Sequence, residues 1–126
     1  MKKRILIVDD DAFYRRLMVD VFNRYNFEIV TAIDGTDAMN FVAKHLFDLI
    51  ILDYHLPRKN GDEIMREMAE RCIDAPVIVI TADDTIETER TIRSFGPTYL
   101  FVKPFEIKDL CKVVNKLFAP KVKIPS

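Results

Sequence analysis

Acidic, hydroxyl and basic side chains directly follow four apolar segments of the sequence. The first segment is followed by Asp9-Asp10-Asp11, and three later ones by Asp53, Thr81 and Lys103. Carboxylates held together repel one another, so a cluster of them binds a cation or retains a proton. Their hard oxygen atoms favour Mg²⁺, which typically takes one or two carboxylates and a phosphate oxygen. A lysine charge and a threonine hydroxyl beside such an ion would bind an anionic group.

The chemistry that fits this combination is phosphoryl binding. An aspartate at such a site can itself be the nucleophile and form an acyl phosphate, while a metal ion and a lysine neutralise the charge of the transition state. Each residue alone has a simpler explanation. Asp10 or Asp11 could be no more than the N-cap of the next helix. Thr81 could likewise be a capping residue, and Lys103-Pro104 could simply mark a turn. Capping alone explains all four strand ends poorly, so a phosphoryl site is favoured.

The elements that must position these residues are five apolar, β-branched runs, at residues 5–8, 27–32, 49–52, 77–80 and 99–102. Four of them are continuous rather than alternating, which is typical of strands covered on both faces. Helical periodicity follows each run, and this alternation predicts an α/β domain with a parallel sheet. Ligands bind such sheets beyond the carboxyl ends of the strands, which is where the acidic, threonine and lysine residues stand.

The helical segments differ in their apolar content. The first is expected to turn its apolar residues inward, namely Phe13, Leu17, Met18, Val21 and Tyr25. The second and third continue this pattern to Leu46 and Cys72. The fourth, at residues 85–95, has only Ile86, Ile92 and Phe95, so we expect thin packing and mobility there.

The composition limits the class of protein. A chain of 126 residues is one ordinary domain. Apolar residues make up 49% and charged residues 31%, which is typical of a globular protein and excludes a disordered chain. Lysine and arginine number 19 against 20 acidic residues, a net charge of −1. This balance gives no electrostatic reason to expect nucleic acid as a direct partner.

Cysteine usage and the two ends of the chain suggest a cytoplasmic protein. Cys72 and Cys111 lie in apolar patterns, and we expect two reduced core thiols without a disulfide. The apolar run after the basic N-terminus is too short for a signal peptide, and no run approaches a membrane span. Residues 120–126 contain two prolines and lose periodicity. They are expected to be a tail or linker stub after a domain of residues 1–119.

The sequence strongly resembles the receiver domain of bacterial response regulators, the chemotaxis-regulator-like family of two-component signalling. The resemblance runs from Arg4 to Phe118 and depends on four motifs in order. They are Ile5-Leu6-Ile7-Val8-Asp9-Asp10-Asp11, Asp48-Leu49-Ile50-Ile51-Leu52-Asp53-Tyr54-His55-Leu56-Pro57 with Gly61, Val79-Ile80-Thr81-Ala82, and Lys103-Pro104-Phe105. Together, at these spacings, they are highly specific.

The resemblance implies a flavodoxin-like (βα)5 three-layer sandwich whose five-stranded parallel sheet has the order 2-1-3-4-5. It implies that Asp53 accepts a phosphoryl group from a phosphohistidine of a sensor histidine kinase or phosphotransfer protein. Such a domain is a switch that assists its own phosphorylation and dephosphorylation rather than a turnover enzyme. Its partner would be a downstream protein or a fused output domain, and it would be a monomer or a weak phosphorylation-dependent dimer.

The resemblance also implies how the metal is bound. Asp10, Asp53 and the backbone carbonyl of His55 would ligate Mg²⁺, or Mn²⁺ in its place, and Asp9 would act mostly through water. Thr81 would bond a phosphoryl oxygen.

Lys103 would pair with the phosphoryl group, and its bond to Pro104 is expected to be cis. Phosphorylation would shift Thr81 and the face made by the fourth helix, fifth strand and fifth helix. The sequence departs from the family at Leu100, where a switch aromatic is usual, and Tyr99 should face the other way.

The variable positions His55 and Asp83 flank the path of the attacking water in the family, and a contact between them over the site would tune the phosphoryl lifetime. The simpler explanation for His55 is a solvated histidine on an exposed loop.

Three other functions would also fit an α/β domain of this size. A haloacid-dehalogenase-like phosphatase would need a substrate-covering cap, which this sequence lacks. A flavodoxin-like cofactor carrier would need a Ser/Thr/Gly-rich phosphate loop after the first strand, where three aspartates would repel a phosphate. A pseudo-receiver that only binds proteins is the remaining alternative; the intact set of site residues argues against it, while Leu100 leaves it open.

Overall fold

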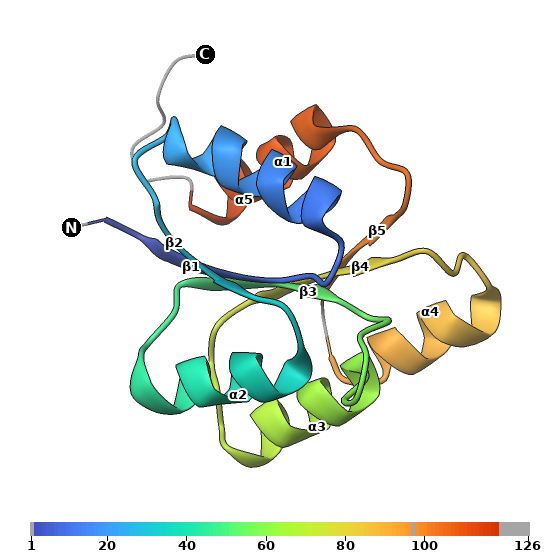
Figure 1. The fold of residues 1–126 in the computed structure, drawn as a ribbon. Helices are drawn as coiled ribbons and strands as arrows, with labels where there is room; N and C mark the ends of the chain where they lie inside the picture. The colour runs from blue at the N-terminus through green and yellow to red at the C-terminus, as the bar shows by residue number, and fades with distance from the viewer. Residues whose placement is uncertain (1, 97, 119–126) are drawn as a thin grey trace.

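The structure is a computed structural model that describes residues 2–96 and 98–118. Its centre is a parallel sheet of five strands: β1 (Arg4–Val8), β2 (Glu28–Ala32), β3 (Leu49–Asp53), β4 (Val77–Thr81) and β5 (Tyr99–Val102). Their order is β2-β1-β3-β4-β5, as Figure 1 shows. The predicted α/β class, strand order and parallel sheet are confirmed.

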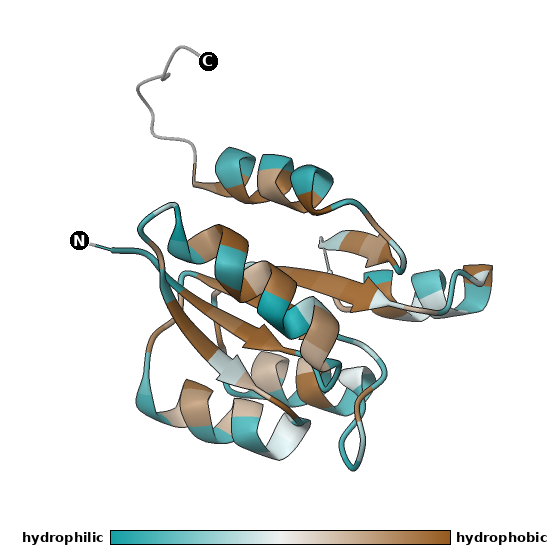
Figure 2. Cartoon of the chain, turned by 45° about the horizontal axis from the view of Figure 1, so that its top comes forward, coloured by the Kyte–Doolittle hydropathy of each residue, from teal (hydrophilic) through white to brown (hydrophobic). Residues whose placement is uncertain are grey.

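Five helices cover the two faces of the sheet, which gives three layers (Figure 1). On one face lie α1 (Ala12–Asn23) and α5 (Ile107–Leu117), and on the other α2 (Gly35–Lys44), α3 (Gly61–Glu70) and α4 (Ile86–Arg93). Each strand therefore sends alternate side chains to two separate cores. Figure 2 shows the result: mostly hydrophobic strands between helices in which hydrophobic and hydrophilic residues alternate.

Strand β1 illustrates the two cores. Its Leu6 and Val8 pack with the helices α2, α3 and α4, and Ile5 and Ile7 pack with α1 and α5. All four side chains are buried. Both faces of this strand are covered by helices, which explains why its apolar run is continuous rather than alternating.

The inner face of α1 differs from the prediction. Met18 is buried as expected, but the second buried residue of this helix is Phe22. Phe13 is 68% exposed and Tyr25 is also exposed. Phe13 lies nine positions before Phe22 and therefore on the opposite side of the helix, and Tyr25 lies beyond the end of the helix, so neither reaches the core.

Helices α2 and α3 end earlier than the apolar pattern predicts. The backbone becomes extended at His45 after α2, and Leu46 is 91% exposed. After α3, Cys72 has a φ of +56° and is exposed, while Cys111 is intermediate in exposure. The prediction of a buried thiol is therefore wrong for Cys72. Both cysteines are free thiols, as predicted.

Helix α4 is as thinly packed as its sequence predicts. Ile92 is its one buried residue, and Ile86 is 74% exposed. No helix within residues 2–96 and 98–118 is long and apolar enough to cross a membrane. The predicted tail of residues 120–126 lies outside the described residues.

Candidate functional site

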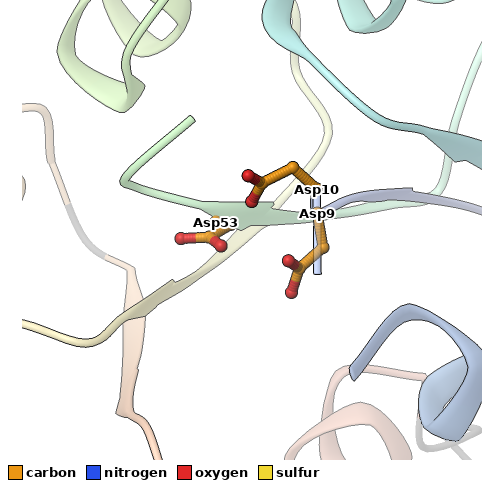
Figure 3. Close-up of side chains that lie close together, drawn as sticks. All are labelled: Asp9, Asp10 and Asp53. Carbon is orange, nitrogen blue, oxygen red and sulfur yellow. The ribbon is translucent and has the colours of Figure 1, made fainter. Parts of the chain in front are cut away.

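Three aspartates meet at the carboxyl ends of the neighbouring strands β1 and β3. Asp9 and Asp10 follow β1 and Asp53 ends β3, and each offers a carboxylate oxygen within 4.8 Å of the others (Figure 3). The register pairs Val8 of β1 with Leu52 of β3, so Asp9 and Asp53, the next residue in each strand's direction, lie side by side. Asp9 and Asp53 are buried and Asp10 is exposed, which leaves the cluster open on one side.

Lys103 brings a positive charge to this cluster from the end of β5. Its Nζ donates a hydrogen bond to Oδ2 of Asp53 at 3.0 Å and lies 3.3 Å from Oδ2 of Asp9. The backbone N–H of Lys103 donates to the carbonyl of Thr81 at 2.7 Å, which fixes the lysine beside β4. The Lys103–Pro104 peptide bond is cis, as predicted.

Thr81 ends β4, between the strands that carry Asp53 and Lys103. It is fully buried, and its Oγ1 accepts a hydrogen bond from the backbone N–H of Asp83 at 3.0 Å. A hydroxyl both donates and accepts, so this bond leaves its hydrogen for an acceptor in the site. The structure thus brings together Asp9, Asp10, Asp53, Thr81 and Lys103 at one edge of the sheet.

The electrostatics of the cluster show an excess of negative charge. Burial, with the neighbouring charge of Asp53, raises the pKa of Asp9 to about 7. Oδ2 of Asp9 has no hydrogen-bond partner among the residues that the structure describes. Burial alone would lower the pKa of Lys103, but the hydrogen bond and charge of Asp53, together with Asp9, raise it. One ammonium group therefore does not balance the carboxylates.

This imbalance fits a divalent cation. Clustered carboxylates, among them a buried oxygen without a hydrogen bond, are the hard donors that Mg²⁺ prefers. Asp10 offers its side chain on the exposed side of the cluster, whereas Asp9 and Asp53 are buried. The acidic set predicted from the sequence therefore has the donor chemistry for a metal ion.

Backbone donors orient the acids. Oδ1 of Asp53 accepts from the N–H of His55 at 3.0 Å, and Oδ1 of Asp9 accepts from the N–H of Asp11 at 2.8 Å. Asp11 itself caps α1 by accepting from the N–H of Phe13. Asp11 is therefore the N-cap that the sequence predicted for either Asp10 or Asp11.

Asp83 and His55 lie near the site in different settings. The carboxylate of Asp83 accepts hydrogen bonds from the N–H of Thr85 and the hydroxyl of Thr88, and the bond from Thr88 lowers its pKa. His55 is exposed, and its ring contacts Tyr54 edge to face. Within the described residues, no hydrogen bond or ion pair joins His55 to Asp83, and their tuning role stays a prediction.

Leu100 lies on the face of β5 that packs against α4. It belongs to the core that contains Ile92, whereas Tyr99 packs in the opposite core with α1 and α5. The prediction that these two side chains face opposite ways is confirmed. The position at which the family usually has an aromatic residue is thus filled by an aliphatic side chain directed at α4.

One residue of the site was not predicted from the sequence. The Nζ of Lys103 lies 4.5 Å from the centre of the Tyr14 ring, on the first turn of α1. The signal that could have indicated it is an aromatic residue in the first turn of the helix that follows Asp9 and Asp10, because that turn begins at the same edge of the sheet.

Sequence comparisons identify related proteins over nearly the whole chain. The model of the response regulator receiver domain matches residues 5–115. Sporulation initiation phosphotransferase F of Bacillus subtilis is 33% identical over 116 residues, which cover 92% of this chain and 94% of that protein. The transcriptional regulatory protein PdtaR of Mycobacterium tuberculosis is 34% identical over 90% of this chain, but the chain spans only 55% of that longer protein.

A structural comparison agrees. The CheX–CheY–BeF3–Mg²⁺ complex of Borrelia burgdorferi contains a chain with a TM-score of 0.84 and 27% identity. The match covers 92% of this chain and 89% of that chain. With the strand order, the acidic cluster and the matched family model, the comparisons establish that this chain belongs to the response regulator receiver domains of two-component signalling.

Proposed function

We propose that this chain is a Mg²⁺-dependent phosphoryl acceptor whose Asp53 is the acceptor residue. The observation that carries the proposal is the setting of the Asp53 carboxylate. It stands at the end of a buried strand, 3.0 Å from the Lys103 ammonium and within 4.8 Å of the Asp9 and Asp10 carboxylates. A carboxylate held between a cation and further metal ligands is poised as a nucleophile toward a phosphoryl group.

The donor would be a phosphohistidine on a sensor histidine kinase or phosphotransfer protein. A carboxylate oxygen of Asp53 attacks the phosphorus atom, and the bond from phosphorus to the donor's imidazole nitrogen breaks. The electron pair of that bond leaves with the imidazole, which takes up a proton. Lys103 then pairs with a phosphoryl oxygen, and the hydroxyl of Thr81 donates to another.

Asp10, Asp53 and the backbone carbonyl of His55 would hold Mg²⁺ directly, and Asp9 through water. Mn²⁺ prefers the same oxygen ligands. The ion, when bound, neutralises charge on the transferring group. The Borrelia burgdorferi relative was solved with BeF3 and Mg²⁺, which supports this part of the proposal.

The output of this switch would be the face formed by α4, β5 and α5, which would bind a downstream protein or a fused output domain. The thin packing of α4 supports a two-state element there. The domain would assist its own phosphorylation and dephosphorylation rather than turn over substrate. The proposal places the domain, residues 1–119, in the cytoplasm as a monomer or a weak phosphorylation-dependent dimer, without direct contact to nucleic acid.

The proposal is tested by the intact mass of the protein after incubation with acetyl phosphate, with and without Mg²⁺. Wild type should gain one phosphoryl group only when Mg²⁺ is present, and Asp53→Asn should gain none. If wild type gains none, a beryllofluoride titration decides between the remaining functions. Binding would indicate a receiver that only a partner kinase can phosphorylate, and no binding would indicate a pseudo-receiver that acts only by binding proteins.

A further inference from the structure

The ammonium group of Lys103 is shared between carboxylates and an aromatic ring. Its Nζ lies 3.0 Å from Asp53, 3.3 Å from Asp9 and 4.5 Å from the centre of the Tyr14 ring. The lysine side chain is only 12% exposed. A cation over a tyrosine ring at this distance is attracted by the ring's electrons, more strongly where water is excluded.

The Tyr14 ring is itself held in place by other aromatic rings. It stacks on Phe105 with centroids 5.4 Å apart and an interplanar angle of 26°, and Phe13 contacts it edge to face at 5.3 Å. Phe105 also packs against Phe101 of β5 at 5.5 Å. The ring is therefore fixed between α1 and the segment that follows the cis Lys103–Pro104 bond.

A lysine needs such support more than most site residues. Its ammonium group stands on a flexible four-carbon stem and is strongly hydrated. The two carboxylate partners of Lys103, Asp9 and Asp53, belong to the acidic cluster. The charge of this cluster would change when a cation or a phosphoryl group binds. The Tyr14 ring is a partner whose charge stays the same through both events.

We infer that Tyr14 is a positioning residue that holds the Lys103 ammonium at the phosphoacceptor Asp53. The inference rests on the proposed function, because the purpose of the contact is to place the lysine for phosphoryl transfer. The ring supplies an attractive surface on one side of the ammonium and leaves its N–H groups to Asp53 and the incoming phosphoryl oxygens. A phenylalanine ring would do the same, and an aliphatic side chain would not.

The test compares Tyr14→Leu, Tyr14→Phe and the matched control Tyr25→Leu, which removes an exposed tyrosine ring just beyond the same helix. The rate of phosphorylation by acetyl phosphate and Mg²⁺ is followed by intact mass, so that no partner protein is needed. Tyr14→Leu should react about 5-fold more slowly than wild type. Tyr14→Phe and Tyr25→Leu should react at the wild-type rate.

A second measurement reads the contact without any phosphorylation. In the metal-free protein, the Tyr14 ring should shift the NMR signals of the Lys103 Hε protons upfield. Tyr14→Leu should move these signals toward the values of a solvated lysine, and Tyr14→Phe should retain the shift. Chemical-shift agreement elsewhere in the spectrum shows that each variant is folded.

Equal reaction rates for wild type and Tyr14→Leu would overturn the inference, as would unchanged Lys103 signals in that variant. Equal slowing by Tyr14→Leu and Tyr14→Phe would also overturn it, because the ring would then not be the cause. A wild-type chain that takes up no phosphoryl group from acetyl phosphate and binds no beryllofluoride would overturn the proposed function and, with it, the role of Tyr14 in transfer. The Lys103 signals would still report whether the ring holds the ammonium, so the two failures are distinguishable.

Discussion

At the scale of single residues, the site is a group of like charges that the fold brings together against their mutual repulsion. Asp9 and Asp53 are buried, and a carboxylate oxygen of Asp10 lies within 4.8 Å of theirs. Lys103 forms ion pairs with Asp9 and Asp53. Like charges at such distances disfavour the ionised forms. The folded, metal-free protein is therefore less stable than it would be with one acid fewer.

Removing one of these charges should stabilise the metal-free protein. We expect Asp53→Asn to raise the melting temperature in EDTA by about 3–6 °C, since relief of repulsion worth about 1 kcal/mol shifts the midpoint by this much. Mg²⁺ at 100 times its dissociation constant should stabilise wild type by about 2.7 kcal/mol and the variant by less. Thermal unfolding by circular dichroism measures both effects.

The control for this experiment is Asp11→Asn, because Asp11 caps α1 outside the cluster and asparagine is an equally good cap. It should leave the melting temperature and the Mg²⁺ increment unchanged. A lower melting temperature for Asp53→Asn, or an equal Mg²⁺ increment in both proteins, would contradict the convergent acidic site.

The buried Asp9 should also make stability depend on pH. Burial raises its pKa from 3.8 to about 7 in the folded chain. Between these values the folded state holds a proton that the unfolded state has released, so the free energy of unfolding falls as the pH rises. The stability gained by binding this proton is fully present at about pH 4 and is lost by about pH 7. The loss is on the order of 2–4 kcal/mol.

Urea unfolding in EDTA at several pH values measures this slope. Asp9→Asn should flatten it, whereas Asp20→Asn, which changes an exposed acid of α1, should retain it. Stability of wild type that rises between about pH 5 and pH 7, or the same slope in Asp9→Asn, would show that Asp9 keeps its ordinary pKa.

At the scale of elements, α4 depends more on its N-terminal hydrogen bonds than on packing. Ile92 is its one buried residue. Oγ1 of Thr85 accepts from the N–H of Thr88, and the carboxylate of Asp83 binds both Thr85 and Thr88. These bonds begin two residues after the buried Thr81, so the start of α4 is connected to the site.

Removing this cap should loosen α4 alone. An N-cap threonine contributes about 1 kcal/mol, so Thr85→Ala should speed hydrogen exchange of the amides of Ile86–Arg93 by about 5-fold. Exchange in α1 and the central strands should not change. Hydrogen exchange followed by mass spectrometry measures this, and uniform acceleration across the chain would show that α4 is not an independent unit.

The elements also show where sequence patterns succeed and fail. Apolar runs located all five strands because both faces of the sheet are buried, as Leu6 and Ile7 illustrate. Apolar periodicity did not locate the ends of α2 and α3, because it does not encode the extended backbone at His45 or the positive φ at Cys72 that end these helices. The exposed Leu46 and Cys72 continue the helical pattern in sequence but not in space.

At the scale of the whole molecule, the parallel sheet gathers into one site residues that lie far apart in the chain. The strand order came from the family resemblance, since alternation of strands and helices alone allows several orders. The acids, Thr81 and Lys103 could be predicted because each lies at the carboxyl end of a strand or just after it. The contact of Tyr14 with Lys103 could not, because it depends on how α1 lies against the end of β5.

The central claim is that Asp53 accepts the phosphoryl group, and the most direct test locates that group on the chain. After reaction with acetyl phosphate and Mg²⁺, borohydride reduces an acyl phosphate to an alcohol, so a modified aspartate becomes homoserine and is identified by peptide mass spectrometry. We expect homoserine at position 53 alone, and only when Mg²⁺ was present. Homoserine at position 9 or 10, or at position 53 without Mg²⁺, would contradict the account.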